Sequence, residues 1–274
     1  MRIRISHATT YCYDRPPATV TQVLRLTPRN HDGQYVATWR IDLSEDCQLH
    51  QREDAFGNIT HSFTAEGPLK RLTVAVEGEV ETQDTSGVVS GAVERFPPQF
   101  YLRETTLTQS DAAIAGFAES LGGDGLGQLP LLHGLLDAVH REIVFDTDPT
   151  HAATTAAEAF GLRRGVCQDL THIFIAAART LGVPARYVGG HLYRIDGVTA
   201  QEAGHAWAEA FVENLGWVGF DAANGICTTD AHVRVAAGLD YLGAAPVRGS
   251  HFGGDGETLD VAVHVDQVSR QSQS

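Results

Sequence analysis

Three residues in the second half of the chain have side chains that together can break or transfer an acyl bond: Cys167, His205 and Asp221. A thiol becomes an effective nucleophile when a nearby base takes its proton and a third group orients that base. An imidazole, with an ordinary pKa of about 6.5, can accept this proton and later return one to a leaving amine. A carboxylate on the other ring nitrogen fixes the tautomer and stabilises the imidazolium. These residue types therefore predict a nucleophile, a base and an orienting acid, provided that the fold brings them together.

The candidate nucleophile, Cys167, stands at the start of a predicted helix that ends near Leu181. Apolar residues repeat with the helical period on one face of this segment: Leu170, Ile173, Phe174, Ala177, Ala178 and Leu181. Gly182 and Pro184 end the helix. At its first turn, unpaired backbone N–H groups and the helix dipole favour a negative charge on the sulfur, and the backbone N–H of Cys167 is a natural oxyanion donor. Gly165 leaves room for another group to approach the thiol.

A buried and inert cysteine is the alternative interpretation, because free cysteines commonly behave as small apolar residues. Cys167, however, lies off the apolar face of its helix, and the polar residues Gln168 and Asp169 follow it. Asp169 favours the helix dipole, although its charge opposes the formation of a thiolate nearby. The position is therefore more typical of a reactive cysteine than of a core residue.

The candidate base and acid lie on neighbouring predicted strands. His205 begins one strand, in which alternation places His205, Trp207 and Glu209 on one side and three alanines on the other. We expect the alanine side to pack against the helix of the candidate nucleophile. Asp221 ends the following strand, and neighbouring antiparallel strands can place residues from both on one face. Glu209 and Asn224 remain rival groups for orienting the histidine.

Further residues near this constellation are candidates for binding substrate or an oxyanion: Gln168, His191 and Trp207. A second oxyanion donor is expected from the side chain of Gln168 or from a group between Asp146 and His151. His191 follows two glycines and is predicted either to line the cleft or to lie on the surface of its strand. We expect no metal site.

The composition limits the classes of partner. Lys and Arg number 20 against 34 Asp and Glu, which gives a formal net charge of −14. This balance argues against nucleic acid or an anionic membrane as the main partner. The four cysteines include no close pair of the kind found in zinc sites or redox motifs. Because no stretch approaches the roughly 20 apolar residues of a membrane span and the N-terminus lacks the features of a signal peptide, we expect a cytoplasmic protein.

The hydrophobic pattern changes near residue 105 and predicts two domains, 1–105 and 106–274. Short runs with period two, separated by turn residues, predict a β-sandwich in the first domain: 3–13, 20–26, 36–43, 59–64 and 72–80. Its histidines, including His7, are scattered and predict no catalytic constellation. The second domain has predicted helices at 112–121, 129–144, 156–160 and 167–181, and strands at 185–195, 205–212, 217–221 and 259–265. Helices followed by a group of antiparallel strands make an α+β domain.

Several motifs in order resemble the bacterial transglutaminase-like superfamily: Gly165–Asp169, Leu181–Val188, His205–Glu209 and Gly216–Asp221. Segments on either side extend the resemblance over nearly the whole chain: Leu24–Arg29 and Phe56–Asn58 resemble the preceding β-rich region, and Ala237–Tyr241 and Pro246–Gly249 resemble the segments that follow. The chain departs from the family pattern in two places. Asp-Ala-Ala-Asn-Gly from Asp221 replaces the more usual Asp-Pro-Thr-Asn-Gly, and His191 stands where an aromatic residue is common. These changes leave the triad intact and concern substrate preference.

The resemblance implies a papain-like core of helices packed on an antiparallel sheet, in which Cys167 is the nucleophile, His205 the base and Asp221 the orienting acid. It also implies a thioester intermediate and no cofactor. We therefore expect a protease, amidase or acyltransferase that acts on a peptide or protein substrate, with water or a primary amine as acceptor. Two other classes compete with this hypothesis: a metallohydrolase using His191, His205 and Asp221, and a binding or assembly module without chemistry. The oligomeric state does not follow from the sequence.

Overall fold

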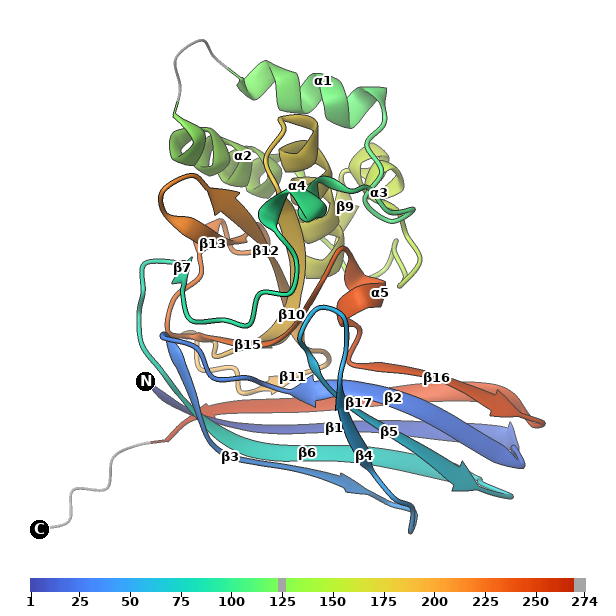
Figure 1. Ribbon diagram of the computed structural model, residues 1–274. Helices are drawn as coiled ribbons and strands as arrows, with labels where there is room; N and C mark the ends of the chain where they lie inside the picture. The colour runs from blue at the N-terminus through green and yellow to red at the C-terminus, as the bar shows by residue number, and fades with distance from the viewer. Residues whose placement is uncertain (123–126, 269–274) are drawn as a thin grey trace, which may run out of the picture.

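Two layers of antiparallel strands form one part of the molecule, and a core of helices and strands lies against them (Figure 1). The computed structural model describes residues 1–122 and 127–268. Over these residues the chain is β-rich, with an N-terminal β region followed by the helical part of the core. No helix in the described part of the chain combines the length and the apolar character needed to cross a bilayer.

The N-terminal region contributes strands to two sheets, as the alternating pattern predicts. The larger sheet has the order β11-β17-β1-β6-β3, with β1 (Arg2–Arg15), β3 (Gln34–Leu43), β6 (Arg71–Thr82), β11 (Ala200–Gln201) and β17 (Asp255–Gln267). The smaller sheet has the order β16-β2-β5-β4, with β2 (Thr19–Thr27), β4 (His50–Glu53), β5 (Ile59–Glu66) and β16 (Val247–Phe252). Apolar side chains of both sheets, including Leu24, Phe63 and Leu72, meet in a shared core, because each strand buries every second residue.

The last two strands return to these sheets, which corrects the assignment of all residues after 105 to a second domain. β16 pairs with β2, and β17 pairs along nearly the whole of β1. The strand predicted at 259–265 therefore exists, but it lies in the larger N-terminal sheet and not in the core. Residues far apart in the sequence thus complete one sheet, and the core is formed by the intervening part of the chain (Figure 1).

The core consists of one antiparallel sheet with helices on one side. The sheet has the order β14-β13-β12-β10-β15, with β10 (Ala185–Leu192), β12 (His205–Val212), β13 (Gly216–Asp221), β14 (Ile226–Cys227) and β15 (His232–Gly238); β7 (Val88–Val89) pairs with β13. The helices are α1 (Ala112–Leu121), α2 (Gln128–Glu142), α3 (Ala156–Leu162), α4 (Cys167–Thr180) and α5 (Tyr241–Ala244), and a 3-10 turn spans Pro98–Leu102. The chain after α2 forms β8 (Val144–Phe145), which pairs in parallel with β9 (Arg164–Gly165).

The predicted helices owe their boundaries to local signals in the sequence. The Asp111 side chain accepts a hydrogen bond from the backbone N–H of Ile114 at 2.8 Å and caps α1. Thr155 and Glu158 form the predicted capping box of α3, since each side chain accepts from the other's backbone N–H. The α2 helix is shorter than predicted, because the chain becomes extended as it enters β8.

The alanines of β12 face α4, as the alternation predicts. Ala206, Ala208 and Ala210 are buried in the same apolar cluster as Ile173 and Phe174 of the helix. Short side chains let the helix approach the sheet closely, and this fixes the height of the helix start above the strands. The packing therefore determines where Cys167 lies relative to the strand that carries His205.

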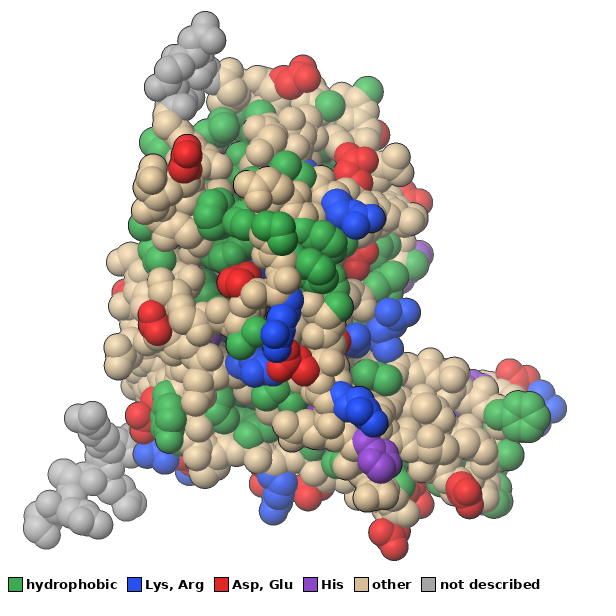
Figure 2. Space-filling model, in the orientation of Figure 1, with side chains coloured by type: hydrophobic (Ala, Val, Ile, Leu, Met, Phe, Trp, Pro, Cys, Tyr) green, Lys and Arg blue, Asp and Glu red, His purple; other side chains and the backbone are tan. Residues whose placement is uncertain are grey.

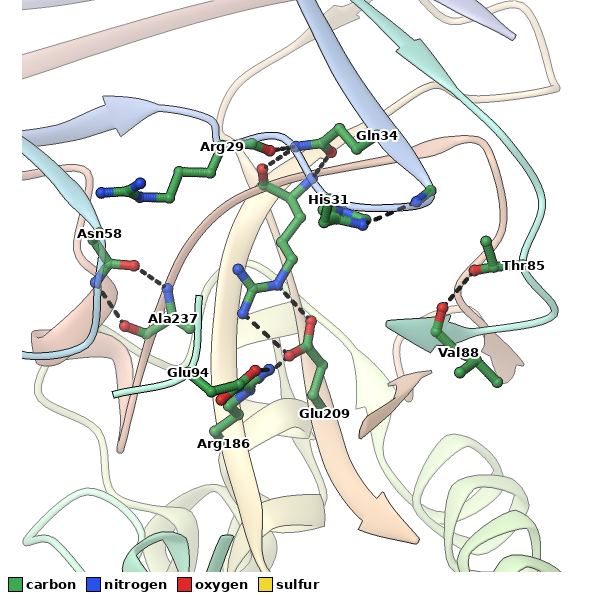
Figure 3. Close-up of polar contacts among 12 residues, drawn as sticks. Arg29, His31, Gln34, Asn58, Thr85, Val88, Glu94, Arg186, Glu209 and Ala237 are labelled. Atoms are coloured by element: carbon green, nitrogen blue, oxygen red, sulfur yellow. Dashed lines mark hydrogen bonds and ion pairs between the residues drawn. The ribbon is translucent and has the colours of Figure 1, made fainter. Parts of the chain in front are cut away.

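The opposite side of the core sheet is joined to the N-terminal strands by polar side chains (Figure 3). The Gln34 side chain donates to the backbone oxygen of Arg234 at 2.9 Å and accepts from its backbone N–H at 2.8 Å. Asn58 makes the same two kinds of bond with the backbone of Ala237, both at 2.8 Å. Both amides thus bind β15, and the N-terminal region supports a strand of the core directly.

A buried ion-pair network lies below these amides (Figure 3). Glu209 of β12 is fully buried between the guanidinium groups of Arg186 and Arg234, each 2.7 Å away. Arg186 also pairs with Glu94 at 2.8 Å and covers the Trp217 ring. Burial alone would raise the pKa of Glu209, but the two arginines lower it to about 2, so this residue stays charged as part of the scaffold.

The visible surface carries acidic and basic side chains in close neighbourhood, especially over the junction between the core and the sheets (Figure 2). In this part of the chain, Glu53 forms ion pairs with both Arg29 and Arg95. Exposed pairs of this kind are screened by solvent and contribute little stability. They neutralise one another locally, so neither sign dominates the face shown.

Candidate active site

Cys167 occupies the first position of α4, at the end of the short β9 strand. Asp169 holds this turn in place: its Oδ2 accepts from the backbone N–H of Val166 at 2.8 Å and from the Thr150 hydroxyl at 2.7 Å. Gly182 adopts the left-handed conformation, with φ of 75°, and ends the helix as predicted. The backbone N–H of Cys167 thus belongs to the first turn, where the helix itself supplies no acceptor.

Asp169 is a buried structural acid, and it does not point at solvent. Its side chain is 1% exposed, and its Oδ1 has no hydrogen-bond partner among the described residues. Burial raises the pKa of Asp169, although Thr150 and Val166 oppose this effect. Gly165 is required here, because a Cβ at this position would lie 2.6 Å from Asp169 Oδ2. The glycine before the cysteine therefore makes room for the capping carboxylate, which the sequence alone did not indicate.

His205 and Asp221 are in direct polar contact at this end of the sheet. The His205 Nε2 lies 2.7 Å from Asp221 Oδ2, and the carboxylate is fully buried. Burial by itself lowers the pKa of His205, but the Asp221 carboxylate and then the Cys167 sulfur raise it, with a net rise to about 10. Burial alone would raise the pKa of Asp221, yet the two neighbouring histidines hold it well below its ordinary range. The pair thus favours an imidazolium beside a carboxylate.

Two further groups hold the Asp221 carboxylate. Asn224 donates from Nδ2 to Asp221 Oδ2 at 2.7 Å, so the residue considered as a rival orienting group acts on the same carboxylate. His232, at the start of β15, lies with its Nε2 3.1 Å from the same oxygen. The backbone N–H of Thr229 donates to the Nδ1 of His232 at 3.1 Å. Since Nδ1 is an acceptor, His232 donates through Nε2, and Asp221 receives hydrogen bonds from three side chains.

Sequence reasoning missed His232 because it did not predict the strand that carries it. The only signal was the alternation of apolar and polar residues that begins at this histidine, within a segment rich in alanine and glycine. Glu209, the other rival orienting group, lies in the ion-pair network described above and does not contact His205.

A cavity of about 250 Å³ opens beside Cys167 and His205, and Gln168 lines it as well. The Gln168 Nε2 also donates to the backbone oxygen of Ala152 at 3.3 Å. Within the described chain, no residue from Asp146 to His151 lines this cavity. Of the two predicted sources of a second oxyanion donor, Gln168 lines the cavity and the segment from Asp146 to His151 does not.

His191 and Trp207, the other predicted substrate contacts, do not line this cavity. A β-bulge between Gly189 and Gly190 interrupts the alternation of β10, and His191 beyond it is buried against the ring of His7, with centroids 5.5 Å apart. Trp207 is 2% exposed and packs edge-on against His232, with centroids 5.2 Å apart. Trp207 packs against His232, and neither His191 nor Trp207 lines the cavity beside Cys167.

Among the residues that the structure describes, one group of side chains has donor atoms close enough together to surround a metal ion: His205, Asp221 and His232, whose ligand atoms lie within 4.8 Å of one another. This set replaces the one considered from the sequence, since His191 lies elsewhere. Both imidazoles contact the same carboxylate oxygen at hydrogen-bond distance, and Asn224 donates to it too. The contacts describe a hydrogen-bonded network centred on Asp221.

A cysteine at a helix start and a histidine–carboxylate pair on the adjoining antiparallel sheet define a candidate thiol site in a core of helices and strands. Residues 3–81 match the family described as the bacterial transglutaminase-like N-terminal region. Residues 128–222 match the transglutaminase-like superfamily. The chain belongs to this superfamily and carries both of its regions in the order that the sequence motifs indicate.

Relatives and a solved structure resemble the chain over nearly its full length. An uncharacterized protein of Mycobacterium leprae is 26% identical over 282 residues, which cover 98% of this chain and 99% of that protein. An uncharacterized protein of Mycobacterium tuberculosis is 26% identical over 289 residues, which cover 96% of this chain and 92% of that protein. A crystal structure from Cytophaga hutchinsonii, described as that of a candidate cysteine protease, superposes with a TM-score of 0.80 at 18% identity, covering 99% of this chain and 92% of that one. This last similarity establishes the fold.

Proposed function

We propose that the protein is a thiol-dependent acyl-transfer enzyme that attacks a peptide or carboxamide bond. The observation that carries the proposal is the 2.7 Å contact between His205 and Asp221 at the cavity into which Cys167 also opens. A histidine held by a buried carboxylate next to a cysteine at a helix start is the arrangement that thiol nucleophiles require. The acyl group comes from a peptide or protein, and water or a primary amine accepts it.

The reaction divides into two halves at His205. In the first, His205 takes the Cys167 proton, the sulfur bonds to the acyl carbon, and the carbon–nitrogen bond breaks as the imidazolium returns a proton to the leaving amine. In the second, His205 deprotonates water or an amine, which attacks the thioester carbon and releases the Cys167 sulfur, and the sulfur regains a proton from the ring. Because Asp221 contacts Nε2, the Nδ1 edge of His205 is the edge available for these transfers.

The negative oxygen that forms in each half-reaction needs hydrogen-bond donors. The backbone N–H of Cys167 at the helix start is one such donor, and the Gln168 side chain at the cavity is the second. Loss of one oxyanion donor typically reduces kcat by a factor of about 10² to 10³. A Gln168→Leu substitution keeps the approximate size of the side chain and removes this donor.

Labelling and mass spectrometry test the proposal directly. We expect iodoacetamide at neutral pH to modify Cys167 faster than Cys12, which is exposed but has no histidine partner in the described structure. Incubation with a mixture of glutamine-containing peptides, with and without a primary amine, should give cleaved, deamidated or cross-linked products, and Cys167→Ala should abolish them. Turnover that persists in Cys167→Ala would refute the proposal. A Cys167 that is no more reactive than Cys12, and that forms no thioester, would instead favour a binding module.

A further inference from the structure

We infer that the cavity beside Cys167 binds an uncharged, apolar side chain next to the acyl carbonyl, and that strands β1 and β17 of the N-terminal sheet select it. The inference rests on the proposed function and adds the chemical class of the acyl donor. Its basis is the position, charge and size of the cavity.

The cavity lies on the inner face of the larger sheet, between two parts of that face that other elements bury. At one end of the inner face of this sheet, side chains such as Tyr13 and Val74 are buried against the smaller sheet. At the other end, residues such as Ile5 and Val265 are buried with Val233 of the core. Between these two covered ends, part of the same face is left to the cavity. The wall opposite Cys167 is therefore made by the N-terminal sheet.

Cross-strand pairs build this wall. Thr9 pairs with Val261, and Tyr11 pairs with Leu259, so all four side chains project from one face of adjoining strands β1 and β17. All four line the cavity together with Cys167. The scattered histidines of the N-terminal region also have one member here: His7 lies on the same face and lines the cavity, although the sequence suggested no role for it.

Apart from His205, which is protonated at neutral pH beside Asp221 and Cys167, the walls of the cavity carry no permanent charge. Among the described residues that line it there is no Asp, Glu, Lys or Arg, in a chain that has 34 acidic and 20 basic residues. Burial lowers the pKa of His7 to about 4, so this ring is neutral at pH 7, and it contacts the Thr9 hydroxyl at 3.2 Å. The His205 charge is already paired with the Asp221 carboxylate, so a charged substrate group would lose its hydration here without a counter-ion of its own, which is unfavourable. An aliphatic or aromatic group meets matching surfaces.

The size of the cavity points to a single side chain. Ligand pockets for drug-sized molecules typically measure about 300 to 1,000 Å³, and this cavity, at about 250 Å³, lies just below that range. One branched or aromatic residue with its own carbonyl at Cys167 fits this scale better than a long polar chain. We therefore assign a residue such as leucine or phenylalanine to the acyl side of the bond.

Peptidyl chloromethyl ketones that end in Leu, Phe, Asp or Lys test the inference. In the labelling step the Cys167 sulfur bonds to the methylene carbon and chloride leaves, while the thiol proton passes to the buffer. We expect the Leu and Phe probes to label the wild-type protein about 50-fold faster than the Asp and Lys probes, since hydrophobic sites discriminate by factors of about 10 to 200 for small apolar differences and charge adds to this. Equal rates within twofold would overturn the inference.

A charge placed on the wall should weaken the preference for apolar probes. Leu259 is 57% exposed at the cavity, so Leu259→Arg is compatible with folding, and Phe252→Arg is the matched control, because Phe252 is exposed in β16 and does not line the cavity. We expect Leu259→Arg to reduce the Leu-to-Asp rate ratio at least tenfold and Phe252→Arg to leave it unchanged. An unchanged ratio in Leu259→Arg would refute the role of β17. Iodoacetamide separates the two proposals. If it labels Cys167 but the chloromethyl ketones label at equal rates, this inference alone is contradicted. If neither reagent labels Cys167, the proposed function is contradicted as well.

Discussion

Replacing Asp221 by asparagine should uncouple His205 from its charge. In the folded protein the Asp221 carboxylate outweighs burial and helps to raise the pKa of His205 from an ordinary 6.5 to about 10. One pKa unit corresponds to about 1.4 kcal/mol, so the folded environment favours the imidazolium by about 5 kcal/mol. In Asp221→Asn, burial becomes the main influence, and we expect the pKa of His205 to fall below 6.5. The ring should therefore be neutral at pH 7.

Two measurements follow this change. Histidine-labelled protein observed by NMR should show His205 as an imidazolium between pH 7 and 9 in the wild type and as a neutral ring in Asp221→Asn. The rate of Cys167 alkylation by iodoacetamide at pH 7 should fall by a factor of about 100, because the neighbouring positive charge that stabilises a thiolate is lost. Asp137→Asn removes the same charge from an exposed position on α2 and serves as the control. Alkylation within threefold of the wild type, with an unchanged His205 titration, would refute this account of the site.

The same pair predicts the pH dependence of stability. Since the pKa of His205 is higher in the folded than in the unfolded chain, its contribution is fully present below about pH 6.5 and is lost as the pH rises through about 10. The difference in unfolding free energy between the wild type and Asp221→Asn should thus be largest near pH 6 and shrink toward pH 10. Urea unfolding at several pH values measures it. A difference that grows with pH over this range would contradict the assignment.

Two further predictions concern residues that support the site. His232→Phe removes one hydrogen-bond donor to Asp221, so the carboxylate should interact more strongly with His205. We expect the pKa of His205 to rise and kcat to fall about tenfold at constant KM. An unchanged His205 titration would indicate that His232 has only a packing role. Glu209→Gln leaves buried guanidinium groups without their central partner and should destabilise the fold by about 3 to 5 kcal/mol in urea unfolding, with the half-buried Glu94→Gln as a milder control. Because the pKa of Glu209 is lowered to about 2, its contribution to the free energy of unfolding is present above about pH 4.5 and is lost as the pH falls toward 2. Equal losses of stability in Glu209→Gln and Glu94→Gln would contradict the central role of Glu209.

The sequence predicted the parts of the fold whose signals are local. The apolar face of α4, the capping residues of α1 and α3, and the alternation in β12 depend on neighbouring residues, and all of them have the predicted structure. The pairing partner of the last strand could not be predicted in this way. Residues 259–265 alternate as any half-buried strand does, and nothing local indicates that they pair with β1 and not with the core.

The candidate site shows the same division. Cys167, His205 and Asp221 stand where helix start, strand start and strand end place them, so their types and local settings were informative. His191, for which the sequence left a cleft and a strand-surface position open, lies beyond a bulge in β10, and a bulge depends on the register of two strands. The cavity wall from β1 and β17 escaped prediction because its residues come from opposite ends of the sequence and carry no reactive groups.

The return of β17 to β1 has a consequence for biosynthesis. Strand β1 leaves the ribosome early, yet one of its hydrogen-bonding edges stays open until residues 255–267 have been made. A nascent chain can therefore fold its helices around α4 and bring Cys167 and His205 together while the cavity beside them still lacks the side made by Leu259 and Val261. The cavity therefore takes its final shape only at the last stage of synthesis, when β17 pairs with β1.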